Sequence, residues 1–209
     1  MAHTLLRSGD MQVIRLSQLM SLTTSGERPA SRAQESMLAI LALGAALVLA
    51  SIWGIAAGSE SAQLAMANAY KVPMVILLSA LTALPAGLVA LRLTNARLPA
   101  VELASTFATS IFGGTLVLAT LAPLVAIYYH TSSKAGLPLA LGSVFVALAT
   151  ASLLFARAVA RRVSERKSLI AVGVLVALFL AALLQFVALA APIIGTHGTA
   201  FDGGFDRVF

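Results

Sequence analysis

The side chains that most often carry out acid–base or metal chemistry are few in this chain and lie far apart. The histidines are His3, His130 and His197, and the absence of cysteine removes thiolate nucleophiles and thiolate metal ligands. The motifs of a serine-hydrolase nucleophile elbow, a zinc protease and a phosphate-binding loop are also absent. We therefore expect no catalytic residues, no cofactor and no metal site.

The hydrophobic and charged fractions of the chain indicate the environment in which it folds. Of 209 residues, 59% are hydrophobic and 11% are charged, against ~45–50% and ~25% in soluble proteins. Crossing a membrane takes ~20 apolar residues, and the uncharged stretches of about that length predict an all-α bundle of five transmembrane helices. These stretches are Met37–Ala57, Pro73–Leu91, Leu103–Tyr129, Leu137–Ala156 and Ser168–Ile194.

The distribution of positive charge predicts how the bundle is oriented. Eleven of the 14 lysines and arginines lie before the first span, after the second or after the fourth. Because cytoplasmic loops carry the excess of Lys and Arg, we expect a cytoplasmic N-terminus and an exoplasmic C-terminus. The alanine-rich composition fits a multi-pass protein of a bacterial inner (plasma) membrane, with an organellar membrane as the alternative.

Three segments follow along the chain. Residues 1–36 form a cytoplasmic segment, in which Asp10 can cap an amphipathic helix over Met11–Leu22 that lies on the membrane or packs on the cytoplasmic loops. Residues 37–194 form the five-span transmembrane domain, with Ser59–Lys71 as a polar external loop. Residues 195–209 form an exoplasmic tail rich in Gly and Phe.

Small side chains four residues apart allow transmembrane helices to approach closely. The third span has such a row, Thr106, Ser110 and Gly114, which rises above the alanine-rich composition. Rows also occur in three other spans, and we expect them to pack inside one bundle rather than to form a dimer interface. These rows are Ala42, Ala46, Ala50 and Gly54; Ser143, Ala147 and Ala151; and Gly173, Ala177 and Ala181.

Other residues within the spans predict local features. Gln185, in the fifth span, can hydrogen-bond across helices, which we favour, or line a polar path. Pro85 and Pro123 each remove a backbone hydrogen bond and predict helix kinks. Trp53 and Tyr128 lie where an aromatic belt would meet the outer interface.

The loop after the fourth span is strongly basic. It sets topology, and the same charges attract anionic lipids at the cytoplasmic face or a soluble partner. We expect no nucleic-acid binding, because no other feature of the chain supports it. The basic residues of this loop are Arg157, Arg161, Arg162, Arg166 and Lys167.

The tail carries Phe201, Phe205 and Phe209 at four-residue spacing, with acidic residues between them. Exposed phenylalanines at helical spacing favour docking on a surface. That surface is the outer face of the bundle, the membrane interface or another protein.

Several short motifs resemble the Yip1-domain family, and more closely a group of bacterial five-span proteins with a Yip1-like pattern. The resemblance covers residues 37–209 and implies a five-span fold and a non-enzymatic role. It implies no mechanism and no site residues, and nothing here corresponds to the GTPase-binding role of eukaryotic members. The motifs are Ala69–Pro73, Ala83–Pro85, Leu121–Pro123 and Pro192–Gly195, followed by the Phe-rich tail.

These residues are compatible with three classes of function. The first, which we favour, is a non-enzymatic accessory or scaffold subunit of a membrane assembly, or a membrane-organising factor, with a protein partner or a second copy. The second is an oligomeric channel or transporter for a neutral or apolar substrate, with Pro85, Pro123, Gln185 and the row around Ser110 along its path. The third, an enzyme acting on lipid, has only Glu102, His130 and His197 as candidates, and Glu102 is predicted on the opposite side of the membrane from both histidines.

Overall fold

The structure, a computed structural model, describes residues 32–93, 98–131, 135–162, 166–191 and 193. Within these residues the fold is all-α and contains no strand, which confirms the predicted fold class. The predictions for residues 1–31 and for the tail, including Phe201, Phe205 and Phe209, lie outside the described residues. The helices are α2 (Arg32–Ala57), α3 (Ala62–Leu93), α4 (Ala100–Thr131), α5 (Gly136–Arg162) and α6 (Arg166–Ala190).

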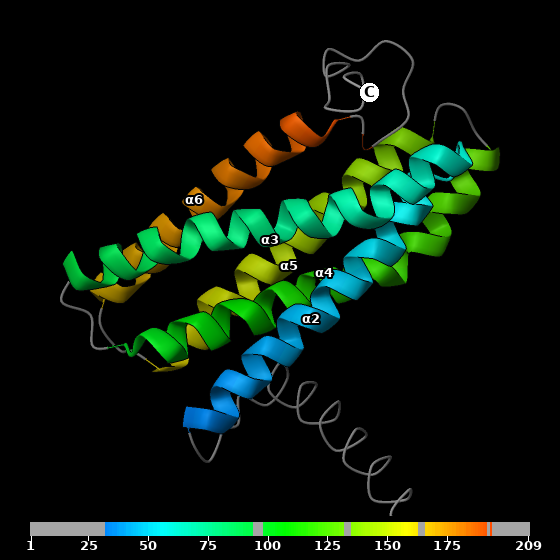
Figure 1. Ribbon diagram of the computed structural model, residues 1–209. Helices are drawn as coiled ribbons and strands as arrows, with labels where there is room; N and C mark the ends of the chain where they lie inside the picture. Colours follow the sequence, from blue (N-terminus) through cyan, green and yellow to red (C-terminus); the bar gives the residue numbers. More distant parts are fainter. Residues whose placement is uncertain (1–31, 94–97, 132–134, 163–165, 192, 194–209) are drawn as a thin grey trace, which may run out of the picture.

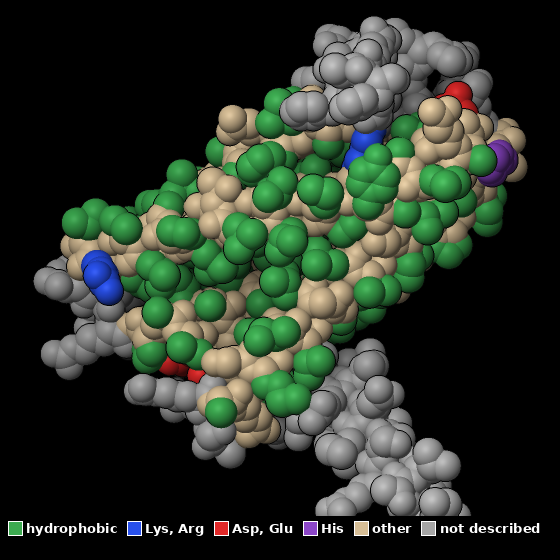
Figure 2. All heavy atoms as spheres, in the orientation of Figure 1, with side chains coloured by type: hydrophobic (Ala, Val, Ile, Leu, Met, Phe, Trp, Pro, Cys, Tyr) green, Lys and Arg blue, Asp and Glu red, His purple; other side chains and the backbone are tan. Residues whose placement is uncertain are grey.

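All five helices are long enough and apolar enough to cross a membrane. Helices α3 and α4 each have 32 residues, or about 48 Å at 1.5 Å per residue, against a hydrocarbon core of about 30 Å. The side of the bundle in Figure 2 is covered with apolar side chains, and charged ones lie near its ends. The chain therefore has the architecture of a multi-pass membrane protein.

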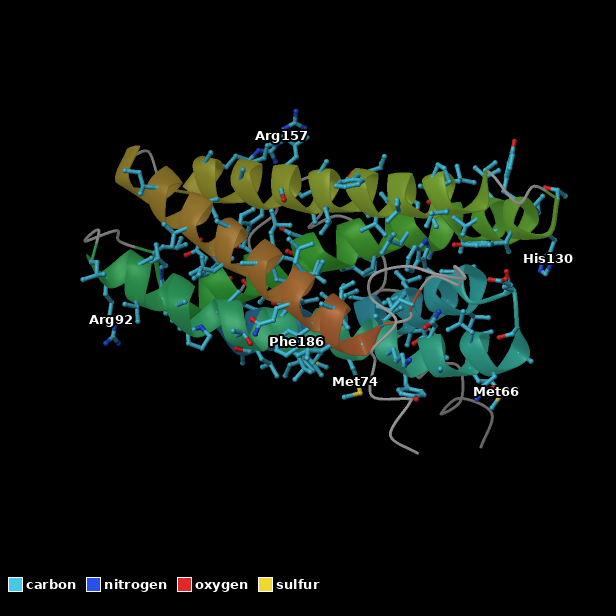
Figure 3. The ribbon with its side chains drawn as sticks, turned by 90° about the horizontal axis from the view of Figure 1, so that it is seen from above. Met66, Met74, Arg92, His130, Arg157 and Phe186 are labelled. Atoms are coloured by element: carbon cyan, nitrogen blue, oxygen red, sulfur yellow. The ribbon has the colours of Figure 1, made fainter. Side chains whose placement is uncertain are left out.

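The two ends of the bundle differ in charge. Figure 3 places Arg92 toward one end, called here the Arg-rich end, and Met66 and His130 toward the other. The last turns of α5, which carry Arg157 and Arg161, run toward the Arg-rich end. The second end holds the turn between α2 and α3 at 58–61 and the connection between α4 and α5. We call it the Asn68 end, after the buried residue described below.

The prediction of an external loop at Ser59–Lys71 was wrong, because α3 already begins at Ala62. The Ser61 hydroxyl accepts a hydrogen bond from the Leu64 backbone N–H at 3.1 Å, as an N-cap side chain does. Four alanines follow within eight residues, and alanine has the highest helix propensity. The polar residues of this segment predict a loop, but they lie on a helix that continues without a break into the apolar span.

The basic segment is likewise mostly helical rather than a loop. Arg157, Arg161 and Arg162 belong to the last turns of α5, and Arg166 and Lys167 begin α6. Only residues 163–165 lie outside the described residues. The side chains of Arg157 and Arg161 are exposed, so their charges point away from the bundle.

The predicted proline positions lie inside continuous helices. Helix α3 runs through Pro73 and Pro85, and α4 runs through Pro123. Pro85 and Pro123 are both exposed on the outside of the bundle. The kinks stay a prediction, and neither proline faces an interior path.

Helix α2 packs against both α3 and α4 (Figure 1). Helix α6 packs on α3 and α5 packs on α4, whereas α5 and α6 touch each other much less. The row Ala42, Ala46 and Ala50 is fully buried on α2. Side chains this small let the neighbouring backbones approach, which is the main source of packing energy in a lipid environment.

A second close approach joins α4 to α5. A Cβ atom added at Gly114 would lie 2.9 Å from both the Ala147 carbonyl oxygen and the Ala151 Cβ. Thr106 and Ser110 of the same row are 2% and 4% exposed. The structure therefore places this row, and the row of small residues on α5, inside the bundle.

Trp53 links α2 to α5 at the Asn68 end. It is buried, so the prediction that it lies in an interfacial belt was wrong. Its indole N–H donates to the Ser143 hydroxyl at 3.0 Å, and that hydroxyl donates to the Ala140 carbonyl at 2.7 Å. Satisfying the N–H inside the protein is what allows the ring to be buried among the helices.

Replacing Ser143 by alanine is expected to lower the free energy of unfolding by about 1–3 kcal/mol, because the indole N–H then loses its acceptor in an apolar surrounding. Unfolding in mixed micelles, followed by the fluorescence of Trp53, the chain's single tryptophan, measures the loss. Thr150→Ala is the matched control, since the Thr150 hydroxyl donates only to the Val146 carbonyl of its own helix. Equal losses in the two variants would contradict the role given to Ser143.

Candidate functional site

The fourth row of small residues lies on the outside of the bundle, unlike the other three. Gly173, Ala177 and Ala181 of α6 are exposed, and a Cβ atom at Gly173 would meet nothing within 4 Å. Each residue lies four positions after the last, so the row forms one face of α6. The prediction that all rows pack inside one bundle was therefore wrong for α6.

Gln185 continues this face by four further positions. Its side chain is exposed, and it lies within the apolar span Val172–Ala190. Within the described part of the chain, no hydrogen bond joins its amide to another residue. The predicted packing role of Gln185 is therefore not fulfilled inside a single chain. We call Gly173, Ala177, Ala181 and Gln185 the α6 outer row.

The environment of the α6 outer row makes Gln185 unusual. An amide removed from water without a hydrogen-bond partner costs several kcal/mol, and hydrocarbon supplies no partner. Alanine and glycine beside it leave room for another backbone to approach. The face thus combines an unsatisfied donor and acceptor with the small side chains needed to reach a second helix.

The interior hydroxyl groups of α4 are, by contrast, satisfied within their own helix. Thr106 donates to the Glu102 carbonyl at 2.6 Å, Ser110 to the Thr106 carbonyl at 2.7 Å, and Thr115 to the Ile111 carbonyl at 3.1 Å. Such bonds to the preceding turn leave no free hydroxyl hydrogen to coordinate a passing solute. The residues proposed for a channel do not come together, because Ser110 is buried while Pro85, Pro123 and Gln185 are exposed.

One hydroxyl of α4 bonds across helices at the Arg-rich end. Ser105 donates to the Glu35 Oε1 of α2 at 2.8 Å and also to the Glu102 carbonyl at 3.1 Å. Both glutamates lie in the first turns of their helices, where a negative charge is favoured by the helix dipole. The contact joins the two helices with the most extensive packing in the fold.

The candidate residues for an enzyme that acts on lipid are far apart. Glu102 lies in the first turn of α4 and His130 in its last turn, so the helix separates them by about 42 Å at its rise per residue. They cannot act on one substrate group. His197 lies outside the described residues.

The sequence reading missed the burial of Asn68 and Lys71 on α3, which are 0% and 6% exposed. The Asn68 Nδ2 donates to the Ile193 carbonyl, and its Oδ1 has no hydrogen-bond partner. This contact holds the chain against α3 just after α6 ends. Three-residue spacing within an alanine-rich stretch was the signal that the two side chains share a helix face.

Comparison with known proteins found no matching family model, no similar curated protein and no matching solved structure.

Proposed function

We propose that this protein is a non-enzymatic membrane protein that works by lateral assembly, with the α6 outer row as its docking face. Exposed Gln185 within the apolar span of α6 is the single feature that carries the proposal. A facing helix with a polar side chain would supply the missing hydrogen bond. The role is that of an accessory or scaffold subunit, or of a membrane-organising factor.

The simplest partner is a second copy of the chain. Two α6 helices related by a two-fold axis bring each Gln185 near the other, and an amide can donate and accept at once. Gly173, Ala177 and Ala181 let the two backbones approach. A polar side chain on another membrane protein would satisfy the same face and would make this chain a subunit of a mixed complex.

The distribution of positive charge indicates how this assembly lies in the membrane and which lipids it contacts. The concentration of Lys and Arg at the Arg-rich end supports a cytoplasmic location for that end in a bacterial inner membrane. Exposed Arg157 and Arg161 support contact with anionic lipid headgroups there. The five-span pattern and the absence of clustered catalytic groups in the sequence support a Yip1-like, non-enzymatic protein.

Cysteine cross-linking in native membranes tests the docking face directly. The chain contains no cysteine, so Ala177→Cys introduces a single thiol on the α6 outer row. A second copy docked on this face brings two such thiols within disulfide range, and we expect an oxidised product of twice the chain's mass. Val48→Cys, exposed on α2, is the matched lipid-facing control.

Adding Gln185→Leu to Ala177→Cys distinguishes a specific interface from collision. An interhelical hydrogen bond in a membrane contributes about 0.6–2 kcal/mol, so association should weaken by about 3- to 30-fold. A heavier product containing another protein would identify a mixed complex. Cross-linking as strong for Val48→Cys as for Ala177→Cys, or no product from Ala177→Cys, would overturn the proposal.

A further inference from the structure

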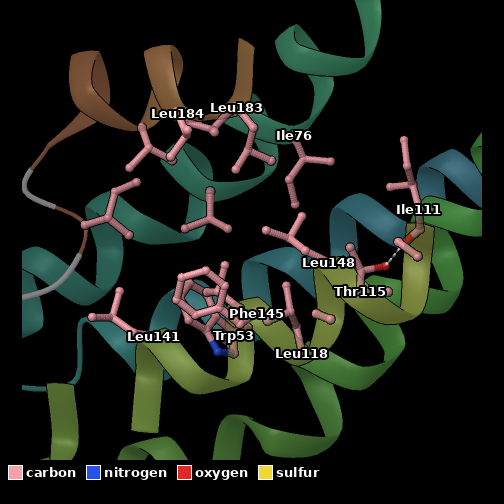
Figure 4. A pocket seen from close by; sticks show the side chains of 18 of the residues that line it. Trp53, Ile76, Ile111, Thr115, Leu118, Leu141, Phe145, Leu148, Leu183 and Leu184 are labelled. Atoms are coloured by element: carbon pink, nitrogen blue, oxygen red, sulfur yellow. Dashed lines mark hydrogen bonds between the residues drawn. The ribbon is translucent and has the colours of Figure 1, made fainter. Parts of the chain in front are cut away.

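A cavity of about 490 Å³ lies between α3, α4, α5 and α6, toward the Asn68 end (Figure 4). The volume falls in the range of about 300–1,000 Å³ typical of small-molecule sites. Leucine, isoleucine, valine and phenylalanine supply most of its wall. The cavity exists because α5 packs on α4 and α6 packs on α3, so α5 and α6 touch each other little.

The few polar side chains in the wall have no free hydrogen to offer. Thr115 donates to carbonyls of its own helix at 3.0 and 3.1 Å. The Trp53 indole N–H already donates a hydrogen bond to the Ser143 hydroxyl. A cavity with this lining neither binds ions nor holds ordered water, since water needs two to four polar partners. Its occupant must therefore be apolar.

The mouth of the cavity opens sideways, between α5 and α6. Phe145 of α5 and Leu184 of α6 line the cavity and are also 70% and 69% exposed. They lie at its edge, on opposite sides in Figure 4. Both belong to helices with the length and apolarity of membrane spans, so the medium at the mouth is the hydrocarbon of the bilayer.

We propose that this cavity binds one acyl chain of a bilayer lipid, which enters between Phe145 and Leu184. An empty apolar cavity costs free energy in proportion to its volume, and an acyl chain gains dispersion contacts with a dense wall. No residue of the α6 outer row lines the cavity, but Leu184 follows Ala177 by seven positions, so the mouth borders that row.

Trp53 is a built-in reporter for this site. It lines the cavity, is 3% exposed and is the only tryptophan. In vesicles of phosphatidylcholine with a 9,10-dibrominated acyl chain, bromine in the cavity should quench Trp53 fluorescence relative to unbrominated vesicles. Because bromine quenches at short range, an acyl chain inside the cavity should quench the buried ring more strongly than the surrounding lipid does.

Val187→Phe, on α6, partly fills the cavity, and Val144→Phe partly fills it from α5. Each should reduce the quenching, whereas Val48→Phe, on the exposed face of α2, should keep it. Two filling variants from different helices guard against a folding defect in either one, which circular dichroism would reveal. Undiminished quenching in a folded filling variant would assign the signal to surrounding lipid and overturn the proposal, as would absence of quenching in the unaltered protein.

Discussion

Replacing Gly54 by alanine is expected to destabilise the bundle by about 2–3 kcal/mol, although alanine is the better helix former. A Cβ atom at Gly54 would overlap the backbone carbonyl oxygen of Asn68 and lie 3.1 Å from the Val72 Cγ2. A backbone atom cannot rotate away as a side chain can. Helices α2 and α3 would have to separate near the Asn68 end, and the Asn68–Ile193 hydrogen bond would weaken with them.

Gly44→Ala is the matched control for this prediction. It is the same change on the same helix, and a Cβ atom at Gly44 meets nothing within 4 Å. Because glycine inside a helix costs up to about 1 kcal/mol relative to alanine, Gly44→Ala should leave stability unchanged or raise it. Unfolding midpoints in mixed micelles compare the two variants. If Gly54→Ala were as stable as Gly44→Ala, the close crossing of α2 and α3 would be wrong.

Replacing Phe107 by alanine is expected to cost about 3–5 kcal/mol of unfolding free energy. The Phe107 ring makes edge-to-face contacts with Phe155 of α5 and Phe179 of α6, at centroid distances of 5.4 and 5.3 Å. All three rings are buried. This cluster connects α5 to α6, which otherwise touch little, so its loss should loosen these two outer helices first.

Phe145→Ala is the appropriate comparison, because Phe145 has the same side chain but is 70% exposed. Its loss removes few contacts and should cost less than about 1 kcal/mol. Hydrogen exchange of α5 and α6 amides, measured in detergent, should rise in the Phe107 variant before exchange rises in α2. Similar exchange and similar stability in the two variants would contradict a structural role for the aromatic cluster.

The sequence by itself determined the fold class and the approximate positions of all five spans. A single stretch of about 20 apolar residues can satisfy its own backbone hydrogen bonds in hydrocarbon only as a helix. Apolarity and charge are properties of single residues, so they can be read without knowing any contact. The same reasoning failed at Ser59–Lys71, because most of its polar residues belong to α3 and do not mark the end of the helix.

Only the tertiary structure decided which faces of the helices are buried. The rows on α2 and α6 look alike in sequence, yet Ala46 is fully buried and Ala177 is exposed. The apolar cavity and the partner of Trp53 likewise depend on helices brought together from distant parts of the chain. The physical reason is that lipid and protein interior are equally apolar, so a transmembrane residue carries no sign of which of the two it will face.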